Sequence, residues 1–215
     1  MATDKPAALI FDMDGVIVDS NPFHREAWRA YNLRHGISTD EAMQRRMFGK
    51  HNAEIVRDFY GGHLSPAEIF QHGAAKEQLY REMMQGSVEQ ALVPGLRAFL
   101  EKHREIPAAV ATNAEPENAH FIFRAATLGH FFCVVVDGHQ VRFPKPHPEI
   151  YLRAASLLGV DPAECIVFED SVWGIEAARA AGMRVIGLRT THKELSGVEL
   201  AVDDFLSPEI DAWFR

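Results

Sequence analysis

A regular alternation of short apolar runs with amphipathic stretches, from Val93 to the end of the chain, constrains the fold more than any other feature. The apolar runs are rich in Val and Ile and predict strands at 107–111, 132–136, 164–168, 184–188 and 199–202. The spacing of apolar residues predicts helices at 96–103, 117–128, 148–158, 174–181 and about 208–213. Continuous apolar strands that alternate with helices are typical of a parallel sheet with helices on both faces. The sequence therefore predicts a doubly wound α/β core.

Another apolar run, at 7–11, predicts a first strand of the same sheet and is followed directly by two acids. Asp12 and Asp14 stand two residues apart, and Gly15 supplies the turn. Residues i and i+2 of an extended segment point to the same side, so the two like charges would face one crevice and repel each other. A bound cation would relieve that repulsion. Because a solvated acidic turn has the same local sequence, the interpretation depends on partners elsewhere in the chain.

Residues 21–92 form a predicted all-helical block between the first strand and the alternating region. Asn21-Pro22 begins a helix that Gly36 ends, and further helices are predicted at 39–48, 52–60 and 65–84. The charged residues of this block are typical of a solvated helical face rather than of a site. The predicted organisation is a core domain, 1–20 with 93–215, and a small helical domain, 21–92, inserted after its first strand.

Composition restricts the class of protein. The 215 residues are 47% hydrophobic, enough to bury a core, and the formal net charge of −8 argues against a sequence-independent grip on nucleic acid or on an anionic membrane. No run approaches the roughly 18 apolar residues of a membrane helix. The N-terminus lacks the pattern of a secretion signal, so the cytoplasm is the expected location. Cys133 and Cys165 each lead into an apolar run and are expected to be core strand residues in a reducing compartment.

Polar residues collect where the predicted strands end, which is where open α/β sheets bind their ligands. Thr112 and Asn113 follow the second strand, Lys145 lies in the loop after the third, and Glu169 with Asp170 follows the fourth. Each has an ordinary alternative, because Thr112 and the acidic pair could cap the next helix and Lys145 could be a solvated loop residue. Together with the two acids of the first strand, however, they occur in an order that can face one crevice. This order favours a common site.

The carboxylates of this set suit a hard metal ion. Asp12, Asp170 and Glu169 supply oxygen ligands, and the absence of His and Cys from the set favours Mg²⁺ over Zn²⁺. The ion would hold a phosphate oxygen against Asp12 and stabilise charge on the transferring group. The sequence therefore predicts Mg²⁺ as the cofactor and phosphoryl transfer as the reaction.

The predicted chemical work is divided among a few side chains. Asp12 is the nucleophile, which forms an aspartyl-phosphate. Asp14 protonates the leaving alcohol and then takes a proton from the attacking water. Lys145 and Thr112, with backbone N–H groups of the turn at Gly15, bind the phosphate oxygens. A crowded acidic site favours the protonated form of Asp14 that the first step needs.

Four short motifs, Asp12-Met-Asp-Gly-Val, Thr112-Asn, Lys145-Pro and Glu169-Asp170, resemble in type and order those of haloacid dehalogenase-like hydrolases, over essentially the whole chain. The inserted block resembles the helical cap of the subgroup that contains phosphoglycolate-type phosphatases, hexose-phosphate phosphatases and β-phosphoglucomutases. The resemblance implies a Rossmann-like core and a cap that closes over a phosphorylated small molecule. It also implies Mg²⁺ held by Asp12, the backbone carbonyl of Asp14, Glu169 and Asp170. A true dehalogenase is not implied, because those enzymes lack the second acid that Asp14 provides.

Residues of the helical block also resemble the mutases of this subgroup. Asp19-Ser20 followed by His24 resembles the mutase hinge, and Lys76 with Tyr80 four residues later resembles the mutase cap lysine. A lone His or Lys on a helix is also typical of a packed or solvated position. A substrate-binding role and an ordinary structural role therefore both stay open for His24 and Lys76. The predicted substrate-binding residues are Gly15, Asn113, Ser20, His24 and Lys76.

Two other positions depart from the mutase pattern. Phe48 precedes Gly49 where the mutases carry a lysine, and Asn52 stands where they carry an arginine. The loss of two cations weakens the grip on a second phosphate, and a mutase must hold both ends of its substrate. We therefore predict a Mg²⁺-dependent phosphatase of a small phosphorylated metabolite, with a sugar phosphate as the expected class. A β-phosphoglucomutase-type mutase is the alternative.

Two further alternatives are a phospho-acceptor signalling domain and a catalytically silent binding protein on the same fold. The signalling domain has its acceptor Asp after the third strand, its hydroxyl after the fourth and its Lys after the fifth, an order that this chain lacks. A silent binding protein is compatible with the fold, since fold alone does not give activity, although all the core chemical groups are present. For a phosphatase or a mutase we expect a monomer or weak dimer, with neither nucleic acid nor membrane as partner.

Overall fold

The computed structural model describes residues 6–47 and 51–214 and divides into two compact units. One unit comprises Met1–Asp19 with Val88–Arg215, and the other comprises Ser20–Ser87. The functional assignment of a core domain and a cap domain stays a prediction.

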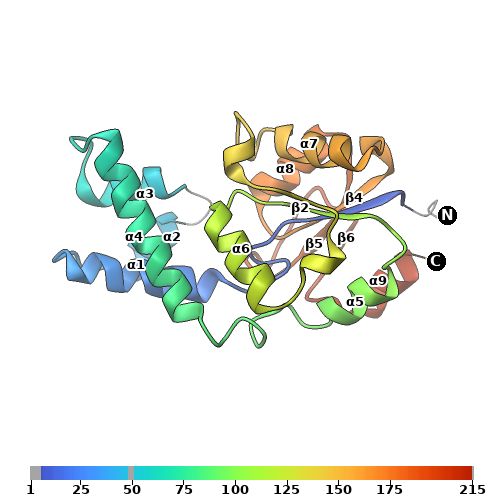
Figure 1. The fold of residues 1–215 in the computed structure, drawn as a ribbon, viewed down its shortest axis with the longest axis horizontal. Coiled ribbons are helices and arrows are strands. Elements are labelled where there is room, and N and C mark those ends of the chain that lie inside the picture. The colour runs from blue at the N-terminus through green and yellow to red at the C-terminus, as the bar shows by residue number, and fades with distance from the viewer. Residues whose placement is uncertain (1–5, 48–50, 215) are drawn as a thin grey trace. The chain divides into compact units, whose positions relative to one another are not determined.

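The larger unit is built on a parallel sheet of six strands in the order β3-β2-β1-β4-β5-β6 (Figure 1). The strands are β1 (Ala8–Phe11), β2 (Ala108–Ala111), β3 (Val134–Val136), β4 (Cys165–Glu169), β5 (Arg184–Leu188) and β6 (Leu200–Val202). Every pair of neighbouring strands is parallel, so all six run in the same direction. The chain order runs outward from the centre in both directions, which places the topological switch point between β1 and β4.

Helices cover both faces of this sheet. They are α5 (Leu96–Lys102), α6 (Pro116–Ala125), α7 (Glu149–Leu158), α8 (Val172–Ala180) and α9 (Pro208–Trp213). α7 and α8 lie on one face, and α5 and α9 lie on the other (Figure 1). The predicted doubly wound α/β core is therefore confirmed. None of the helices within residues 6–47 and 51–214 combines the length and the apolar character needed to cross a membrane.

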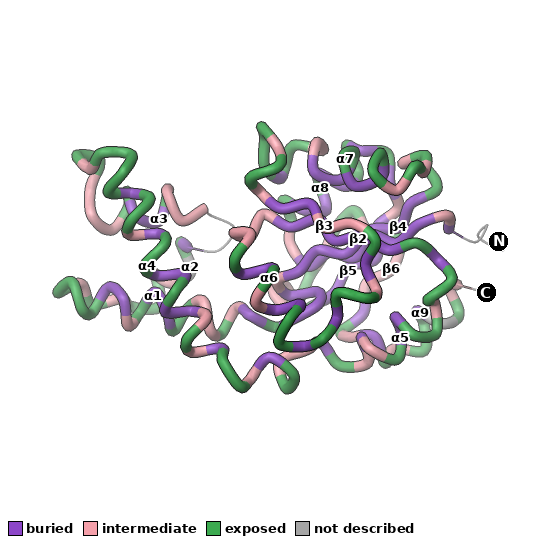
Figure 2. The backbone as a smooth tube through the Cα atoms, in the orientation of Figure 1, coloured by how far each residue is buried: buried purple, intermediate pink, exposed green. Residues whose placement is uncertain are grey.

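Side chains of the central strand alternate between the two faces. Ala8 and Ile10 belong to the apolar cluster shared with α7 and α8. Phe11 points into an aromatic group on the opposite face, where it stacks on Phe168 with ring centroids 4.6 Å apart and lies edge-on to Phe99 of α5. β1, β2 and β4 are buried along their whole length (Figure 2). Strands covered on both faces need continuous apolar sequence, which is the pattern that predicted them.

The smaller unit is all-helical. Its helices are α1 (Asn21–Arg34), α2 (Glu41–Met47), α3 (Asn52–Tyr60) and α4 (Pro66–Met84), and α4 packs against α1 and α3. Ser65 and Glu68 form a reciprocal cap at the start of α4, because the Glu68 carboxylate accepts the Ser65 N–H at 2.8 Å and the Ser65 hydroxyl accepts the Glu68 N–H at 3.3 Å. The predicted beginning of this helix is confirmed.

One expectation about the core was wrong. Cys133 is exposed rather than buried in a strand, because β3 begins only at Val134 and forms an edge of the sheet, with a neighbour on one side. Cys165, the first residue of the central strand β4, is buried as predicted. The helix expected at 117–128 is also shorter and ends at Ala125, since Thr127 adopts a left-handed backbone conformation with φ of 54°.

Candidate active site

The polar residues of the core motifs meet at the carboxyl edge of the sheet, beside the switch point between β1 and β4. The strand register pairs Phe11 of β1 with Val110 of β2 and with Phe168 of β4. Directly after β1, the backbone N–H of Asp12 donates to the Phe168 carbonyl at 3.0 Å. Asp12 therefore follows the central strand at the level where both neighbouring strands end, so their terminal side chains can reach it.

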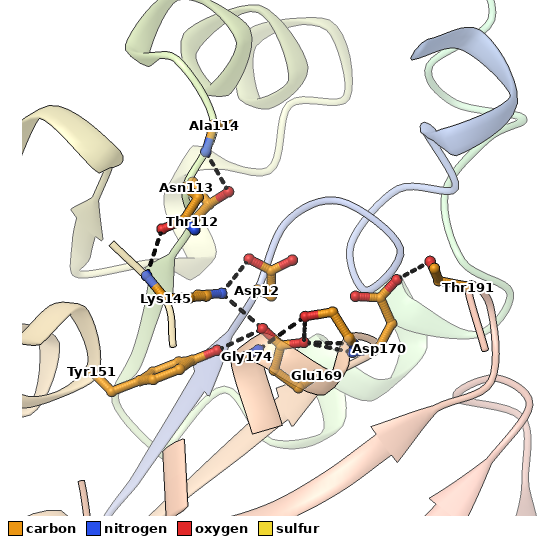
Figure 3. A network of polar contacts seen from close by, with 11 residues as sticks. Asp12, Thr112, Asn113, Ala114, Lys145, Tyr151, Glu169, Asp170, Gly174 and Thr191 are labelled. Carbon is orange, nitrogen blue, oxygen red and sulfur yellow. Dashed lines mark hydrogen bonds and ion pairs between the residues drawn. The ribbon is translucent and has the colours of Figure 1, made fainter. Parts of the chain in front are cut away.

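Lys145 joins two of the acids (Figure 3). Its ammonium donates to Asp12 Oδ1 at 2.7 Å and to Glu169 Oε1 at 2.8 Å. The loop before α7 brings Lys145 to the sheet, where its backbone N–H donates to Asn113 Oδ1 at 3.3 Å. Only 5% of the lysine side chain is exposed, so the alternative of a solvated loop lysine was wrong.

Glu169 is a hydrogen-bond centre. Its Oε1 accepts from the Lys145 ammonium and, at 2.9 Å, from the hydroxyl of Tyr151 on α7. Its Oε2 accepts from the backbone N–H of Asp170 and of Ser171, both at 2.8 Å, and from the Ser171 hydroxyl at 2.9 Å. The acid is fully buried, and five donors compensate for its lost hydration.

Two alternatives based on helix capping do not hold at these strand ends. The buried Thr112 hydroxyl accepts from the Ala114 N–H at 3.1 Å, but the N-cap position of α6 belongs to Glu115 (Figure 3). The N-cap of α8 is Ser171, whose hydroxyl accepts from the Gly174 N–H at 3.0 Å. The motif residues before these helices are therefore positioned in the site without serving as the caps.

The acids leave no room for a side chain at two glycines beside them, Gly15 and Gly174. A Cβ atom on Gly15 would overlap the carboxylate of Asp170, and Gly15 also has a left-handed φ of 80°. A Cβ atom on Gly174, in the first turn of α8, would overlap the carboxylate of Glu169. Glycine at both positions is thus a requirement of the acidic cluster.

Three residues of this site were missed in the sequence. Thr190 donates to the Gly15 carbonyl at 2.5 Å, and the Thr191 hydroxyl donates to Asp170 Oδ2. Both follow β5 closely, so the rule that polar residues at strand ends form the site could have found them. Tyr151 carried no such signal, because an aromatic residue at helical spacing is most simply a core residue.

Electrostatics in the site follow from three buried carboxylates that share one ammonium. Burial raises the pKa of Asp12 well above its usual range; Lys145 opposes this effect, and the charges of Glu169 and half-buried Asp14 add to it. The pKa of Asp170 is raised for the same main reason, burial. At Glu169, burial is outweighed by Lys145 and the hydrogen bonds, which together lower its pKa.

The acidic cluster fits a divalent cation. One oxygen of each of Asp12, Glu169 and Asp170 can be chosen so that all three lie within 4.8 Å of one another. When all three acids are ionised, a single ammonium leaves this buried group with excess negative charge, and the ligand atoms of the group are hard oxygens, which suit Mg²⁺. Asp12 uses Oδ1 for Lys145 and Asp170 uses Oδ2 for Thr191, so among the described residues no donor contacts the second oxygen of either carboxylate.

In the helical unit the structure brings together His24 and Lys76. The buried Lys76 ammonium lies 3.0 Å from His24 Nδ1 and donates to Glu77 Oε1 at 2.7 Å, and His24 stacks on Tyr80 with ring centroids 3.8 Å apart. Burial would raise the pKa of Glu77. The electrostatic effects of Lys76 and His24, together with the hydrogen bonds from Lys76 and Asn52, outweigh burial and lower this pKa to about 2. Lys76 is therefore a paired, buried cation, and the alternative of a solvated lysine was wrong.

The remaining helical-unit expectations have mixed outcomes. Asn52, where the mutases carry an arginine, donates from Nδ2 to Glu77 Oε1 at 2.7 Å and so belongs to the same buried network. Ser20 is buried directly before α1. Phe48 and Gly49 lie outside the described residues. Whether Ser20, His24 and Lys76 bind substrate stays a prediction.

Comparison with known proteins gives one consistent family. Residues 6–182 match the model of a family described as haloacid dehalogenase-like hydrolase. The chain is 36% identical over 188 residues to fructose-1-phosphate phosphatase YqaB of Escherichia coli, covering 86% of this chain and 98% of that protein. It is 35% identical over 189 residues to a phosphorylated carbohydrates phosphatase of Thermotoga maritima, covering 84% of each. A crystal structure of β-phosphoglucomutase from Clostridium difficile superposes with a TM-score of 0.84 at 26% identity, covering 97% of each chain.

The buried pair of the helical unit gives a stability prediction. We expect Lys76→Met to lower the free energy of unfolding by about 3–5 kcal/mol, because it leaves the Glu77 carboxylate buried without its ammonium. The matched control is Arg29→Met, which removes the 2.6 Å pair with Glu26 on the exposed surface of α1 and should change stability far less, because solvent screens an exposed pair. Chemical denaturation followed by circular dichroism measures both variants, and equal losses would contradict a stabilising buried pair.

The same carboxylate predicts how stability depends on pH. The pKa of Glu77 in the folded chain is about 2, below the ordinary value of 4.5, so its contribution is complete above the ordinary value and is lost as pH falls toward 2. We expect Glu77→Gln to vary less in stability than the wild type across this interval. Denaturation curves recorded at pH steps between these values measure the difference, and parallel pH profiles would show that Glu77 has an ordinary pKa.

Proposed function

We propose that this chain, which belongs to the haloacid dehalogenase-like hydrolase family, is a Mg²⁺-dependent phosphatase of a small phosphorylated metabolite. The observation that carries the proposal is the Lys145 ammonium held against Asp12 at the switch point of the sheet. A carboxylate nucleophile needs an adjacent cation that can also meet the incoming phosphate, because two anions otherwise repel each other. Lys145 supplies that cation in a buried place where its charge is weakly screened.

The proposed reaction has two steps at the Asp12 carboxylate. Asp12 attacks phosphorus and forms an aspartyl-phosphate while the bond to the sugar oxygen breaks, and Asp14 gives its proton to the departing alkoxide. Asp14 then takes a proton from water, whose oxygen attacks phosphorus and releases inorganic phosphate and free Asp12. Lys145 and Thr112 bind phosphoryl oxygens, and Asn113 holds the lysine loop through its hydrogen bond to the Lys145 backbone.

Mg²⁺ is the proposed cofactor. When bound, it supplies positive charge that offsets the repulsion between the carboxylates and a phosphate. Asp12, Asp170 and the backbone carbonyl of Asp14 would hold it, with Glu169 beside them. This assignment is supported by the oxygen-only cluster and by the second oxygens of Asp12 and Asp170, which no donor in the described part of the chain contacts.

A sugar phosphate is the proposed class of substrate. Support comes from relatives named as phosphatases of fructose 1-phosphate and of phosphorylated carbohydrates. The alternative, a phosphosugar mutase, is favoured by the likeness to the β-phosphoglucomutase structure. One observation argues against a mutase. The Lys76 ammonium and the Asn52 amide both donate to Glu77, so each already has an acidic partner that would compete with a second phosphate. We expect the protein to act on small molecules in the cytoplasm as a monomer or weak dimer.

A substrate panel tests this proposal and separates the two reactions. Purified protein with Mg²⁺ is incubated with sugar phosphates, including fructose 1-phosphate and β-glucose 1-phosphate, with and without a sugar bisphosphate activator. We expect phosphate release to exceed isomer formation for every substrate, and EDTA to abolish the release until Mg²⁺ is restored. Isomer formation that outruns phosphate release would establish the mutase instead, and no turnover of any substrate would favour a binding protein.

Asp12→Asn tests the nucleophile. The amide has nearly the same shape but cannot attack phosphorus as an anion, so we expect kcat to fall at least about 10³-fold with little change in the fold. The matched control is Asp161→Asn, which changes an exposed acid that caps the short helix Pro162–Glu164 and should leave turnover unchanged. Unaltered turnover by Asp12→Asn would remove this carboxylate from the mechanism.

A further inference from the structure

We infer that Tyr151 is a positioning residue, which fixes the Lys145 ammonium against Asp12 through its hydroxyl contact with Glu169 and through the face of its ring. The inference rests on the proposed function, since it concerns how the phosphate-binding lysine of that reaction is held. It also gives Glu169 a role different from the one expected in the sequence, as a support for Lys145 rather than as a metal ligand.

Tyr151 contacts both members of the Lys145–Glu169 pair. It is a fully buried residue of α7, and its hydroxyl donates to Glu169 Oε1 at 2.9 Å. The Lys145 Nζ atom lies 4.8 Å from the centroid of the same ring, within the range of a cation–π contact. Figure 3 shows the Tyr151 side chain reaching from its helix to the point where the lysine and the glutamate meet.

A lysine in this position needs such a support. Its ammonium is a compact charge at the end of a flexible four-carbon chain, and it carries three N–H donors that can rotate. Two of these donors are directed at Asp12 and Glu169, at 2.7 and 2.8 Å. Holding two donors restricts the direction of the third, which the proposed reaction assigns to a phosphoryl oxygen. The Tyr151 ring restricts the ammonium further by covering one side of it.

Glu169 can transmit this restraint because its carboxylate is saturated. Oε1 accepts from Lys145 and Tyr151, while Oε2 accepts three hydrogen bonds from Asp170 and Ser171 at the start of α8. A carboxylate offers about four lone-pair positions, so five donors leave none for a metal ion. Without the Tyr151 hydroxyl, Oε1 would keep a single donor, and the acceptor that orients Lys145 would be held less firmly.

The hydroxyl is not needed for packing. Tyr151 belongs to the apolar cluster between the sheet and α7, together with Ile150 and Ala154, where a phenylalanine ring would fill the same space. Tyr151→Phe therefore removes one hydrogen bond to Glu169 and keeps both the packing and the ring face toward Lys145.

The experiment compares Tyr151→Phe with the wild type and with Tyr60→Phe. Tyr60 lies in the helical unit and donates its hydroxyl to Asn32 Oδ1 at 2.9 Å, so this control also loses one phenol hydrogen bond. Each protein is assayed with p-nitrophenyl phosphate and with the best sugar phosphate of the panel, over a range of Mg²⁺ concentrations. For Tyr151→Phe we expect kcat to fall about 5- to 50-fold, with KM and the half-saturating Mg²⁺ concentration changed less than about twofold. Tyr151→Leu, which also removes the ring, should lose more.

The outcomes distinguish the inference from a purely structural role and from failure of the proposed function. Wild-type kcat in Tyr151→Phe, or the same loss of kcat in Tyr60→Phe, would overturn the inference. A roughly tenfold rise in half-saturating Mg²⁺, with kcat restored at high Mg²⁺, would also overturn it, because the tyrosine would then act on a metal ligand. Absence of phosphatase activity in the wild type would instead refute the proposed function.

Discussion

Repulsion among buried carboxylates at the end of β1 and β4 is the constraint on which the site depends. Asp12, Glu169 and Asp170 share one ammonium, and burial raises the pKa of two of the three acids. The surrounding chain reduces this cost at each acid. Glu169 receives five hydrogen bonds, Asp170 receives a threonine hydroxyl, and Asp12 receives Lys145, while glycines stand where any side chain would collide with the cluster. When the three acids are ionised, what remains uncompensated is negative charge, which favours a divalent cation at this place.

The fold makes this concentration of charge possible. All six strands are parallel, so their carboxyl ends share one edge, and the central strand β1 has β2 on one side and β4 on the other. Apolar side chains fill both faces of the sheet, from the α7 and α8 side to the aromatic group around Phe11 and Phe168. The strand ends are therefore held by packing on two sides, and the polar residues that follow them keep fixed distances without needing to stabilise the fold themselves.

Two buried lysines, Lys76 and Lys145, show how charge balance distinguishes a candidate site from a structural contact. In the helical unit Lys76 meets the single carboxylate of Glu77, and the pair is balanced, with His24 and Asn52 completing the hydrogen bonds. In the core, Lys145 is outnumbered by the carboxylates around it. A balanced pair has no demand for another ion, whereas an unbalanced cluster does. This contrast supports a cation site in the core and a stabilising role for the Lys76 pair.

Sequence alone determined the order of strands and helices and the core motif residues, because continuous apolar runs specify buried strands and parallel strands bring their ends to one edge. It failed at Cys133, where burial depends on a strand having neighbours on both sides, a property of sheet order. Only the tertiary structure paired Lys76 with Glu77 and brought Tyr151 to Glu169. Neighbours in a helix do not normally face each other, and a buried tyrosine hydroxyl acquires its partner only when α7 packs against β4. The periodicity of apolar residues predicts which side chains are buried. The partner of a buried polar group, in contrast, is decided by contacts between segments that are distant in the sequence.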